Sequence, residues 1–586
     1  MKKNYLLLLF CLYGAGALHA QFTPSTENIL YVNKTVPGGN HTGNSWANAV
    51  PELADALKWA NNNKSNWTAA NPLQIWVATG TYKPMYSPAD NNFGNNAGRD
   101  NAFLMVGNVQ LYGGFDPDNG ITGLTDNRLL PDSGYEGTVL SGDLGVQNNN
   151  ADNAYHVLIS GGEMGAARLD GFTVTGGNAN QDDGVALTVG SGPVRRHFGS
   201  GMYNVNNASP AITHSSFTRN SAVGGGGGMY NYLNASPIIT HSIFSENTAD
   251  YGGGGMFNEV SSAIITHSIF LKNTSGRGGG IQNFREVSLR VTNVVFSSNT
   301  ADLGSGIYDI TGNSTFSNIT LANNSAPYGL YTLVQLYLNN SIIWEPTNLS
   351  DYTTTYNNLF KGSSNTTNGN IDATGFSETD IFNDFANGDY SLKAGAPAVN
   401  AGNNQLYADA GGNLNNDLDF AGNPRLAGAA IDMGAYELQA ALPVMFGAIS
   451  AVIKNGQLLV NWNTETEINN DRFLIQVSPD GANWKTVQTI QSSAKEGNSN
   501  TALEYSSTIP LTTLSLGAGI LLLGVLAGRR RYMFIITVVV CGAFALSCHK
   551  NAAVEAAGNG TLFVRIVQVD KDGTKQVSKV MQAVQQ

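Results

Sequence analysis

The chain has 586 residues, of which only 13% are charged and 68 are glycine, so we expect a surface built mainly from Asn, Ser, Thr and Gly. The formal net charge is −12 and the central part carries no basic stripe, which argues against a nucleic-acid partner, because phosphates require a basic face. Of the three cysteines, Cys11 lies in an apolar leader and Cys541 and Cys548 in a late hydrophobic stretch. The residues between are expected to fold without a disulfide bond.

Residues 1–20 have the order of a secretory signal peptide. Lys2 and Lys3 precede the apolar segment Leu6–Leu12, and small residues follow up to Ala20. This order predicts export, with the mature protein extracellular or on the cell surface. A retained anchor is the alternative interpretation.

A short helix is expected after the leader, over about residues 51–61. Leu53, Ala54, Leu57 and Ala60 recur there at helical spacing. An amphipathic helix at this point can cover the open end of a repetitive β-structure.

The central part of the chain repeats one pattern about every 26 residues, most regularly over about residues 199–331. Each repeat opens with a glycine cluster and a short apolar-aromatic strand, as in Gly-Met-Tyr-Asn at 201–204 and 228–231. The first four repeats close with Phe-x-x-Asn, first at Phe217–Asn220. A fixed period of this size predicts a solenoid, because one unit cannot bury its apolar face alone.

The fold is therefore expected to be all-β, with a right-handed parallel β-helix over residues 21–440 and an N-terminal capping helix. Residues 75–82 and 140–143 resemble the front of secreted bacterial β-helix proteins of the pectate-lyase-like fold. The repeats are similar to those of polymorphic outer-membrane proteins, and residues 390–437 resemble the "choice-of-anchor" closing region of such proteins. This resemblance implies the fold and says little about activity.

Residues 441–586 change to alternating strands and resemble a fibronectin type III-like sandwich. The sandwich is interrupted by two apolar runs over residues 511–548, separated by an Arg triplet at 529–531. We expect these runs to form a hydrophobic helical hairpin that anchors the protein in a membrane. Two alternatives stay open, which are a cleaved sorting tail over Leu514–Arg531 and a lipobox at Ala545–Cys548 within a gene fusion.

One column of the repeats is aromatic and is predicted to lie on the outside of the coil. Strand alternation turns Met202 and Met229 inward, so the residue that follows each of them points outward. The aromatic column consists of Tyr203, Tyr230, Phe257, Tyr308 and Tyr331. An exposed stripe of rings can stack on sugars, which makes these residues the predicted glycan-binding site; stacking that merely protects the strands is the alternative.

Two polar columns are given structural roles. His214, His241 and His267 continue as Asn293 and Asn318, and both residue types tolerate the left-handed backbone of a tight bend. A metal site formed by the histidines is the alternative, but we expect no bound metal. The second polar column is Asn220, Asn247, Asn273, Asn299 and Asn324, which is predicted to form a hydrogen-bonded amide ladder.

One weak set of candidate catalytic residues lies in the insertion after Thr175. It consists of Asp182, Asp183, Arg195, Arg196 and His197, which are able to provide acid and base partners if the insertion folds back on the coil. A solvated loop is the alternative. Acidic turns at Asp116–Gly120 and Asp417–Asp419 also fit calcium, although no cofactor is expected.

The sequence predicts a surface-associated, adhesin-like or glycan-binding protein without catalysis, because no acid/base set converges in the regular repeats. The alternatives are a polysaccharide lyase or glycoside hydrolase that uses the insertion, and a purely structural stalk. The expected partners are a polysaccharide or cell-surface glycan and, through residues 511–548, a membrane.

Overall fold

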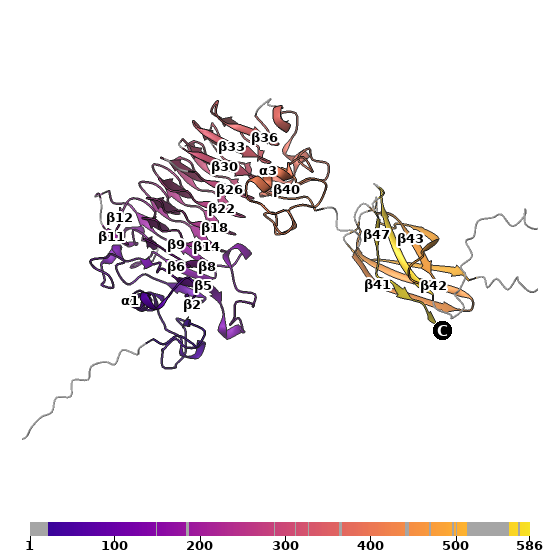
Figure 1. Ribbon diagram of the computed structural model, residues 1–586, viewed down its shortest axis with the longest axis horizontal. Helices are drawn as coiled ribbons and strands as arrows, with labels where there is room; N and C mark the ends of the chain where they lie inside the picture. The colour runs from indigo at the N-terminus through magenta and orange to yellow at the C-terminus, as the bar shows by residue number, and fades with distance from the viewer. Residues whose placement is uncertain are drawn as a thin grey trace, which may run out of the picture. The chain divides into compact units, whose positions relative to one another are not determined.

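The computed structural model describes residues 22–439, 445–511 and 562–586, apart from positions 148, 183, 185–186, 286–287, 311, 326, 363–365, 468–469, 495–496, 498, 500, 572 and 574. The chain divides into two compact units, one up to Leu438 and one from Gln439 onward. The first unit is a coil of stacked parallel strands (Figure 1).

Two eleven-stranded parallel sheets run along the coil. The first sheet contains, in order, β1 (Ile29–Val32), β2 (Leu73–Ala78), β5 (Val109–Phe115), β8 (Arg168–Asp170), β14 (Ala211–Thr213), β18 (Ile238–Thr240), β22 (Ile264–Thr266), β26 (Arg290–Thr292), β30 (Asn313–Ser317), β33 (Gln335–Asn339) and β36 (Thr354–Tyr356). The second sheet contains β3 (Gly80–Tyr82), β6 (Thr138–Ser141), β9 (Phe172–Thr175), β15 (Ser216–Thr218), β19 (Ile243–Ser245), β23 (Ile269–Leu271), β27 (Val295–Ser297), β31 (Thr320–Ala322), β34 (Ile342–Ile343), β37 (Leu359–Phe360) and β38 (Ile371–Asp372).

A nine-stranded third sheet and a five-stranded fourth sheet complete the coil. The third sheet contains β4 (Phe103–Leu104), β7 (Leu158–Gly161), β13 (Met202–Val205), β17 (Met229–Tyr232), β21 (Met256–Glu259), β25 (Ile281–Phe284), β29 (Ile307–Asp309), β32 (Leu330–Thr332) and β35 (Thr347–Asn348). The fourth contains β10 (Asn178–Ala179), β16 (Ser221–Ala222), β20 (Thr248–Ala249), β24 (Thr274–Arg277) and β28 (Thr300–Leu303). The predicted parallel β-solenoid is therefore confirmed, and its right hand stays a prediction.

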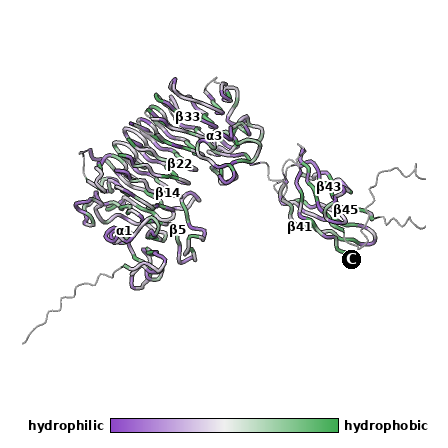
Figure 2. The backbone as a smooth tube through the Cα atoms, viewed as in Figure 1, coloured by the Kyte–Doolittle hydropathy of each residue, from purple (hydrophilic) through white to green (hydrophobic). Residues whose placement is uncertain are grey.

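Equivalent residues of successive repeats lie in register, as the period predicts. Met202 pairs with Met229 and Met229 with Met256, and all three are fully buried. Phe217, Phe244 and Phe270 stack with ring centroids 5.0 and 4.8 Å apart. Figure 2 shows hydrophobic positions recurring along the coil. These rows form one continuous interior, which buries the apolar face that a single repeat leaves open.

The bends and the amide ladder also follow the prediction. His214, His241 and His267 have φ of 46°, 49° and 47°, in the left-handed region. The Nδ2 group of Asn220 donates to Oδ1 of Asn247, at 3.1 Å, and the pattern continues coil by coil to Asn324.

The ladder ends on a carboxylate. Asn324 Nδ2 donates to Oε1 of Glu345 at 3.0 Å, and a carboxylate suits the last position because it only accepts hydrogen bonds. Burial raises the pKa of Glu345 to about 7. A second buried ladder runs from Asn204 to Asn231 and on through Asn258 to Asn283, with the same direction of donation.

The predicted N-terminal helix is α1 (Leu53–Asn62), which lies at the N-terminal end of the coil beside β2 (Figure 1). Leu53, Ala54, Ala56, Leu57 and Ala60 are its buried residues. They belong to the same hydrophobic cluster as Leu30 and Leu73 of the first two strands, so the helix continues the interior of the coil.

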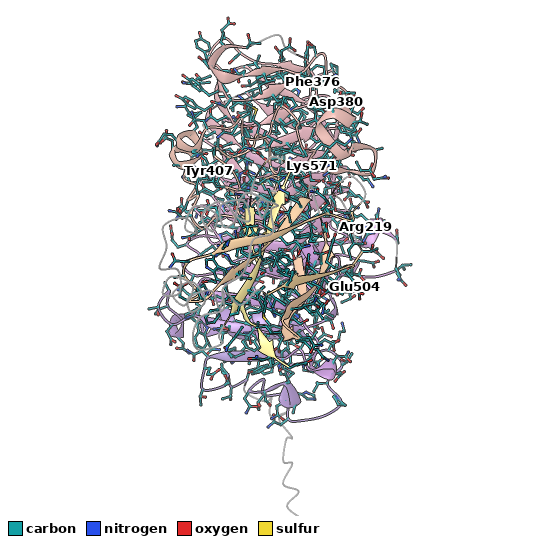
Figure 3. All side chains as sticks on the ribbon, turned by 90° about the vertical axis from the view of Figure 1, so that its right-hand side faces the viewer. Arg219, Phe376, Asp380, Tyr407, Glu504 and Lys571 are labelled. Carbon is teal, nitrogen blue, oxygen red and sulfur yellow. The ribbon has the colours of Figure 1, made fainter. Side chains whose placement is uncertain are left out.

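The closing segment of the first unit packs against the outside of the coil. It contains α2 (Glu378–Ile381), β39 (Phe382–Asp384), β40 (Asp389–Leu392) and α3 (Asn404–Asp409). Its apolar residues cluster with Val295, Ile342 and Leu359 of the second sheet. Tyr407 (Figure 3) accepts a hydrogen bond from Asn293 Nδ2 at 3.1 Å, which fixes the segment to the row of bends.

The second unit consists of two sheets whose strands pair antiparallel, except that β41 pairs with β49 in parallel. One contains β45 (Leu503–Pro510), β42 (Gln457–Thr466), β41 (Met445–Lys454) and β49 (Val584–Gln585), and the other contains β44 (Lys485–Gln491), β43 (Asn470–Ser478), β46 (Phe563–Asp570), β47 (Lys575–Val577) and β48 (Met581–Gln582). Because β43 pairs with β46, the segments before and after the apolar runs build one unit. The likeness to a fibronectin type III domain stays a prediction.

The predicted signal peptide 1–20 lies outside the described residues, and so does the predicted helical hairpin 511–548, except for Leu511. Across the described ranges, no helix combines the length and the apolar character needed to cross a membrane.

Candidate functional site

The insertion after Thr175 folds back on the coil, and two members of the predicted catalytic set meet there. Oδ1 of Asp182 lies 3.3 Å from Nδ1 of His197, so these two residues do meet. The guanidinium of Arg196 is bidentate to Asp100, with both N–O distances 2.7 Å. Arg195 lies 5.9 Å from the Tyr232 ring centroid. Asp183 lies outside the described residues.

The insertion is held as a cover by contacts with the loop around residues 83–101. Its hairpin consists of β11 (Leu187–Val189) and β12 (Gly192–Val194). The Asp90 carboxylate accepts hydrogen bonds from the backbone N–H groups of Gly190 and Ser191, at 2.9 and 3.0 Å. Phe198, at the end of the insertion, stacks on Tyr230 with a centroid distance of 4.7 Å.

The expectation that the aromatic row is open to solvent is wrong for most of its length. Tyr203 and Tyr230 are fully buried, and Phe257 and Tyr308 are only 2% and 6% exposed. For the first three rings the physical reason is the insertion, whose Val189, Val194 and Phe198 form a satellite hydrophobic cluster with them. Tyr308 is instead contacted by Tyr331 and Arg277. Tyr331 remains half-buried. The rings under the insertion are therefore packing residues rather than a sugar-binding stripe.

The histidine row is stacked in a way that does not converge on an ion. His241 lies 5.0 Å from both His214 and His267, with interplanar angles of 24° and 5°. Nearly parallel rings direct their nitrogen lone pairs side by side, whereas a metal requires ligands that point to one centre. Among the described residues, no group of three or more His, Cys, Asp or Glu side chains is placed to hold a metal ion.

The acidic turns proposed for calcium are engaged in hydrogen bonds within the chain. Asp116 accepts from Asn119 Nδ2 at 2.7 Å, and Asp419 accepts from the backbone N–H groups of Asn423 and Glu437, both at 2.8 Å. These carboxylates stabilise the turns in which they lie.

A different row of aromatic side chains lies on the outer face of the first sheet, near its N-terminal end. Tyr31 pairs with Trp76, and Trp76 pairs with Tyr112. Their neighbours Ile75 and Leu111 point into the core, so alternation places all three rings outside, where they are half-buried. Strands of a sheet lie about 4.8 Å apart, which sets the spacing of the rings along the coil.

Polar side chains form a second row beside these rings. Gln74 pairs with Gln110, and Gln110 with Arg168. Trp76 Nε1 donates to Gln74 Oε1 at 2.9 Å, and the Tyr112 hydroxyl donates to Gln110 Oε1 at 3.2 Å. We call the surface formed by Gln74, Trp76, Gln110, Tyr112, Arg168 and Asp170 the outer-face site.

Neighbouring side chains hold the rings in place. Trp76 stacks on Phe115 at 4.9 Å and 11°, and Tyr31 contacts Trp46 edge-on at 4.9 Å. Trp46 Nε1 in turn donates to the Thr122 carbonyl at 3.0 Å. The ring faces are thus positioned before any ligand arrives, which lowers the entropy lost on binding.

The carboxylate of Asp170 lies at the C-terminal side of the outer-face site. Asp170, the register partner of Tyr112, accepts from Arg128 Nη2 at 2.7 Å and from the Thr213 hydroxyl at 2.6 Å, and Arg168 Nη1 lies 3.6 Å from it. Two guanidinium groups thus share one carboxylate. This leaves positive charge next to the rings.

The adjoining His214 is paired with Asp132, the two atoms Nδ1 and Oδ2 being 2.6 Å apart. This hydrogen bond raises the pKa of His214, and burial opposes it. The pair ties the loop that contains Asp132 to the row of bends. It stands at the edge of the outer-face site, beside Thr213.

The outer-face site was missed from the sequence, although a signal was present. The segments 29–32, 73–78 and 109–115 each alternate apolar core residues with Tyr, Trp or Gln. Their spacing is irregular, however, because long loops separate them, so they do not align as repeats.

Comparisons of the chain with protein-family models, with curated proteins and with solved structures found no match.

Proposed function

We propose that the protein is an exported, surface-associated β-solenoid that binds polysaccharide without cleaving it, through the outer-face site. The observation that carries the proposal is the in-register row of Trp76 and Tyr112 beside Gln74, Gln110 and Arg168. An aromatic face stacks on the apolar face of a sugar ring, while amides and guanidinium groups hydrogen-bond its hydroxyls. Rings repeated along the coil suit a polymer that repeats in the same way.

Binding without cleavage is favoured by the state of the carboxylates. Hydrolysis of a glycosidic bond commonly requires two carboxyl groups, one as acid and one as base or nucleophile. In the outer-face site Asp170 is engaged by Arg128 and Thr213, and the neighbouring Asp132 is engaged by His214. Both carboxylates are therefore committed to holding the site together. Export and membrane attachment through residues 511–548 remain part of the proposal on the sequence pattern alone.

The test is affinity electrophoresis of the full chain in gels that contain a neutral glucan, a mannan, alginate or polygalacturonate. We expect retardation in at least one gel and a much weaker retardation of Trp76→Ala, with affinity lowered by about 2 kcal/mol, roughly thirtyfold in Kd, as for a buried aromatic anchor. Tyr352→Ala is the matched control, because Tyr352 is 73% exposed and lies in a loop far along the chain.

Release of reducing ends or unsaturated products is measured on the same polysaccharides. Turnover that persists in repeat preparations contradicts binding without cleavage. Retardation that is equal for Trp76→Ala and the native chain contradicts the outer-face site, provided that both have the same melting temperature.

A further inference from the structure

A second aromatic surface is formed by residues of the third sheet, of the fourth sheet and of the turns next to them, beyond the end of the insertion. Tyr308 and Tyr331 are register partners and stack with a centroid distance of 5.2 Å and an interplanar angle of 17°. Tyr328 lies 6.0 Å from Tyr331, and Tyr251 is 56% exposed. Together with Arg277 we call these residues the tyrosine patch.

Arg277 connects the rings of the tyrosine patch. Its guanidinium lies 5.6 Å from the Tyr251 centroid and 5.8 Å from the Tyr308 centroid. Within the described part of the chain, this exposed side chain makes no ion pair and no side-chain hydrogen bond. Its five N–H donors are held over aromatic faces and are directed to no acceptor of the protein, which suits a ligand rich in oxygen atoms.

The aromatic row to which Tyr308 and Tyr331 belong already binds a flat ring by stacking. Upstream, Phe198 of the insertion stacks on Tyr230 at 4.7 Å with nearly parallel planes, 16° apart. The insertion ends there, and Gln282 separates Phe257 from Tyr308 in the row. The tyrosine patch thus continues a row that already accepts a stacked ring, at a point where the insertion no longer covers it.

The size of the tyrosine patch favours a sugar over a protein partner. A protein–protein interface of standard size uses about 20–30 residues on each side. Three rings of the tyrosine patch reach solvent, those of Tyr251, Tyr328 and Tyr331, while the buried Tyr308 supports Tyr331 by stacking. Three rings and one guanidinium match one or two sugar rings, with aromatic faces for stacking and phenol and guanidinium groups for hydroxyls.

We propose that the tyrosine patch is a second polysaccharide-binding surface, so that one protein molecule crosslinks two polysaccharide chains. This inference rests on the function proposed for the outer-face site. The outer-face site lies on the first sheet, whereas the tyrosine patch has residues of the third and fourth sheets. They are also separated along the axis of the coil. Trp76 lies in the coil that contains β4, and Tyr308 lies in β29 of the same third sheet. At ~4.8 Å per coil, the axial distance between these two strands is roughly 29 Å.

A bivalent protein raises its apparent affinity for a polymer and joins separate chains into a network. The two surfaces lie in one compact unit. A short oligosaccharide on one face cannot reach the other, so joint occupation requires either a long chain or two chains. Crosslinking of polysaccharide chains therefore distinguishes a protein with two binding surfaces from a protein with one.

The experiment measures sedimentation and turbidity of the full chain mixed with the polysaccharide that retards it most in the affinity gels. We expect large complexes that pass through a maximum as the protein-to-polysaccharide ratio rises. The double variant Arg277→Ala/Tyr331→Ala is expected to keep its retardation to within about threefold in Kd and to lose the large complexes. Trp76→Ala loses the complexes as well, and Tyr352→Ala keeps both properties.

The outcomes separate the two proposals. Retardation with undiminished complexes in the double variant overturns the second surface, and leaves a protein partner as the use of the tyrosine patch. Retardation of the native chain without any large complexes overturns crosslinking alone. Absence of retardation on every polysaccharide overturns both proposals. The protein alone is sedimented in the same run, so that self-association is separated from crosslinking by polysaccharide.

Discussion

Two rows of aromatic rings lie on outer faces of the same coil, and they differ in what covers them. The row of Tyr203, Tyr230 and Phe257 is sealed beneath the insertion, with exposed fractions of 0 to 2%. The row of Tyr31, Trp76 and Tyr112 is half-buried, with its ring faces positioned by Phe115 and Trp46. Alternation along a strand decides whether a side chain faces the core of the coil. A loop from elsewhere in the chain decides whether an outward side chain meets solvent.

The comparison predicts opposite consequences for the two rows. Truncation in the sealed row removes packing, so it changes the stability of the fold. Truncation in the open row removes a ligand contact, so it changes affinity. The predictions below test this division, beginning with the largest expected effect.

Tyr230→Ala is expected to destabilise the protein by about 3–5 kcal/mol, the range for a large aromatic residue truncated in a core. The ring is fully buried between Phe198 and Tyr203, and its hydroxyl donates to Glu259 Oε2 at 2.6 Å. Chemical denaturation measures the change. Tyr230→Phe is the matched control, because it keeps the ring and removes one hydrogen bond, and it is expected to cost about 1 kcal/mol.

Polysaccharide retardation is measured on the same Tyr230 variants. If Tyr230→Ala leaves stability unchanged and abolishes retardation, the two rows have been assigned the wrong way round. The residues under the insertion are then the binding surface, and the insertion opens in solution.

Much of the coil follows from its sequence, and the reason is local repetition. The inward row of Met202 and Met229, the bends at His214 and His241, and the amide ladder from Asn220 onward recur at one spacing, so each copy reinforces the interpretation of the others. The stacking of equivalent side chains then follows from the geometry of parallel strands.

The cover and the outer-face site could not be predicted in the same way. Arg196 and Asp100 are 96 residues apart, and neither lies in a repeated motif. The sequence grouped Arg196 with the acidic residues of its own insertion. The structure pairs Asp182 with His197 and gives Arg196 a bidentate partner, Asp100, from a distant loop. Likewise, Trp76 and Tyr112 align only when the coil is built, because the loop between their strands has its own length.

Arg196→Ala tests how much the pair of Arg196 and Asp100 stabilises the insertion over the aromatic row. The pair with Asp100 is bidentate, and the two side chains are only 21% and 15% exposed, so we expect a loss of about 2 kcal/mol. The effect should be local, because the coil interior does not contain this pair. Hydrogen exchange over residues 187–198 is the measurement, with faster exchange expected there and little change over β13 and β17.

Arg195→Ala is the matched control for the cover, since Arg195 belongs to the same segment and its guanidinium lies 5.9 Å from the Tyr232 centroid. Its hydrogen exchange should stay close to that of the native chain. Equal acceleration in both variants contradicts a specific role of the Asp100 pair and indicates that the segment is held by its apolar residues.

The smallest effect is expected at the edge of the open row, where Asp132 raises the pKa of His214 above its ordinary value of 6.5. A base whose pKa is higher in the folded state contributes stability that is complete below 6.5 and is lost as the pH rises through the folded value. Because the two side chains are 33% and 23% exposed, we expect no more than about 1 kcal/mol. Asp132→Asn should remove this contribution in melting curves recorded between about pH 5 and 8.

His241→Asn is expected to change the pH dependence with the opposite sign, because burial lowers the folded pKa of His241 to about 4. As the pH falls below 6.5 only the unfolded chain takes up this proton, so the native His241 lowers stability there and the variant does not. Glu345 also lowers the stability of the fold as the pH rises from about 4.5 to 7, since burial raises its folded pKa from 4.5 to about 7. The contribution of Glu345 is present in the native chain and in Asp132→Asn, so the difference between these two curves isolates the pair of His214 and Asp132. A curve for Asp132→Asn that is parallel to the native one contradicts the pair, and places the anchor of the loop at Arg128 and Asp170 instead.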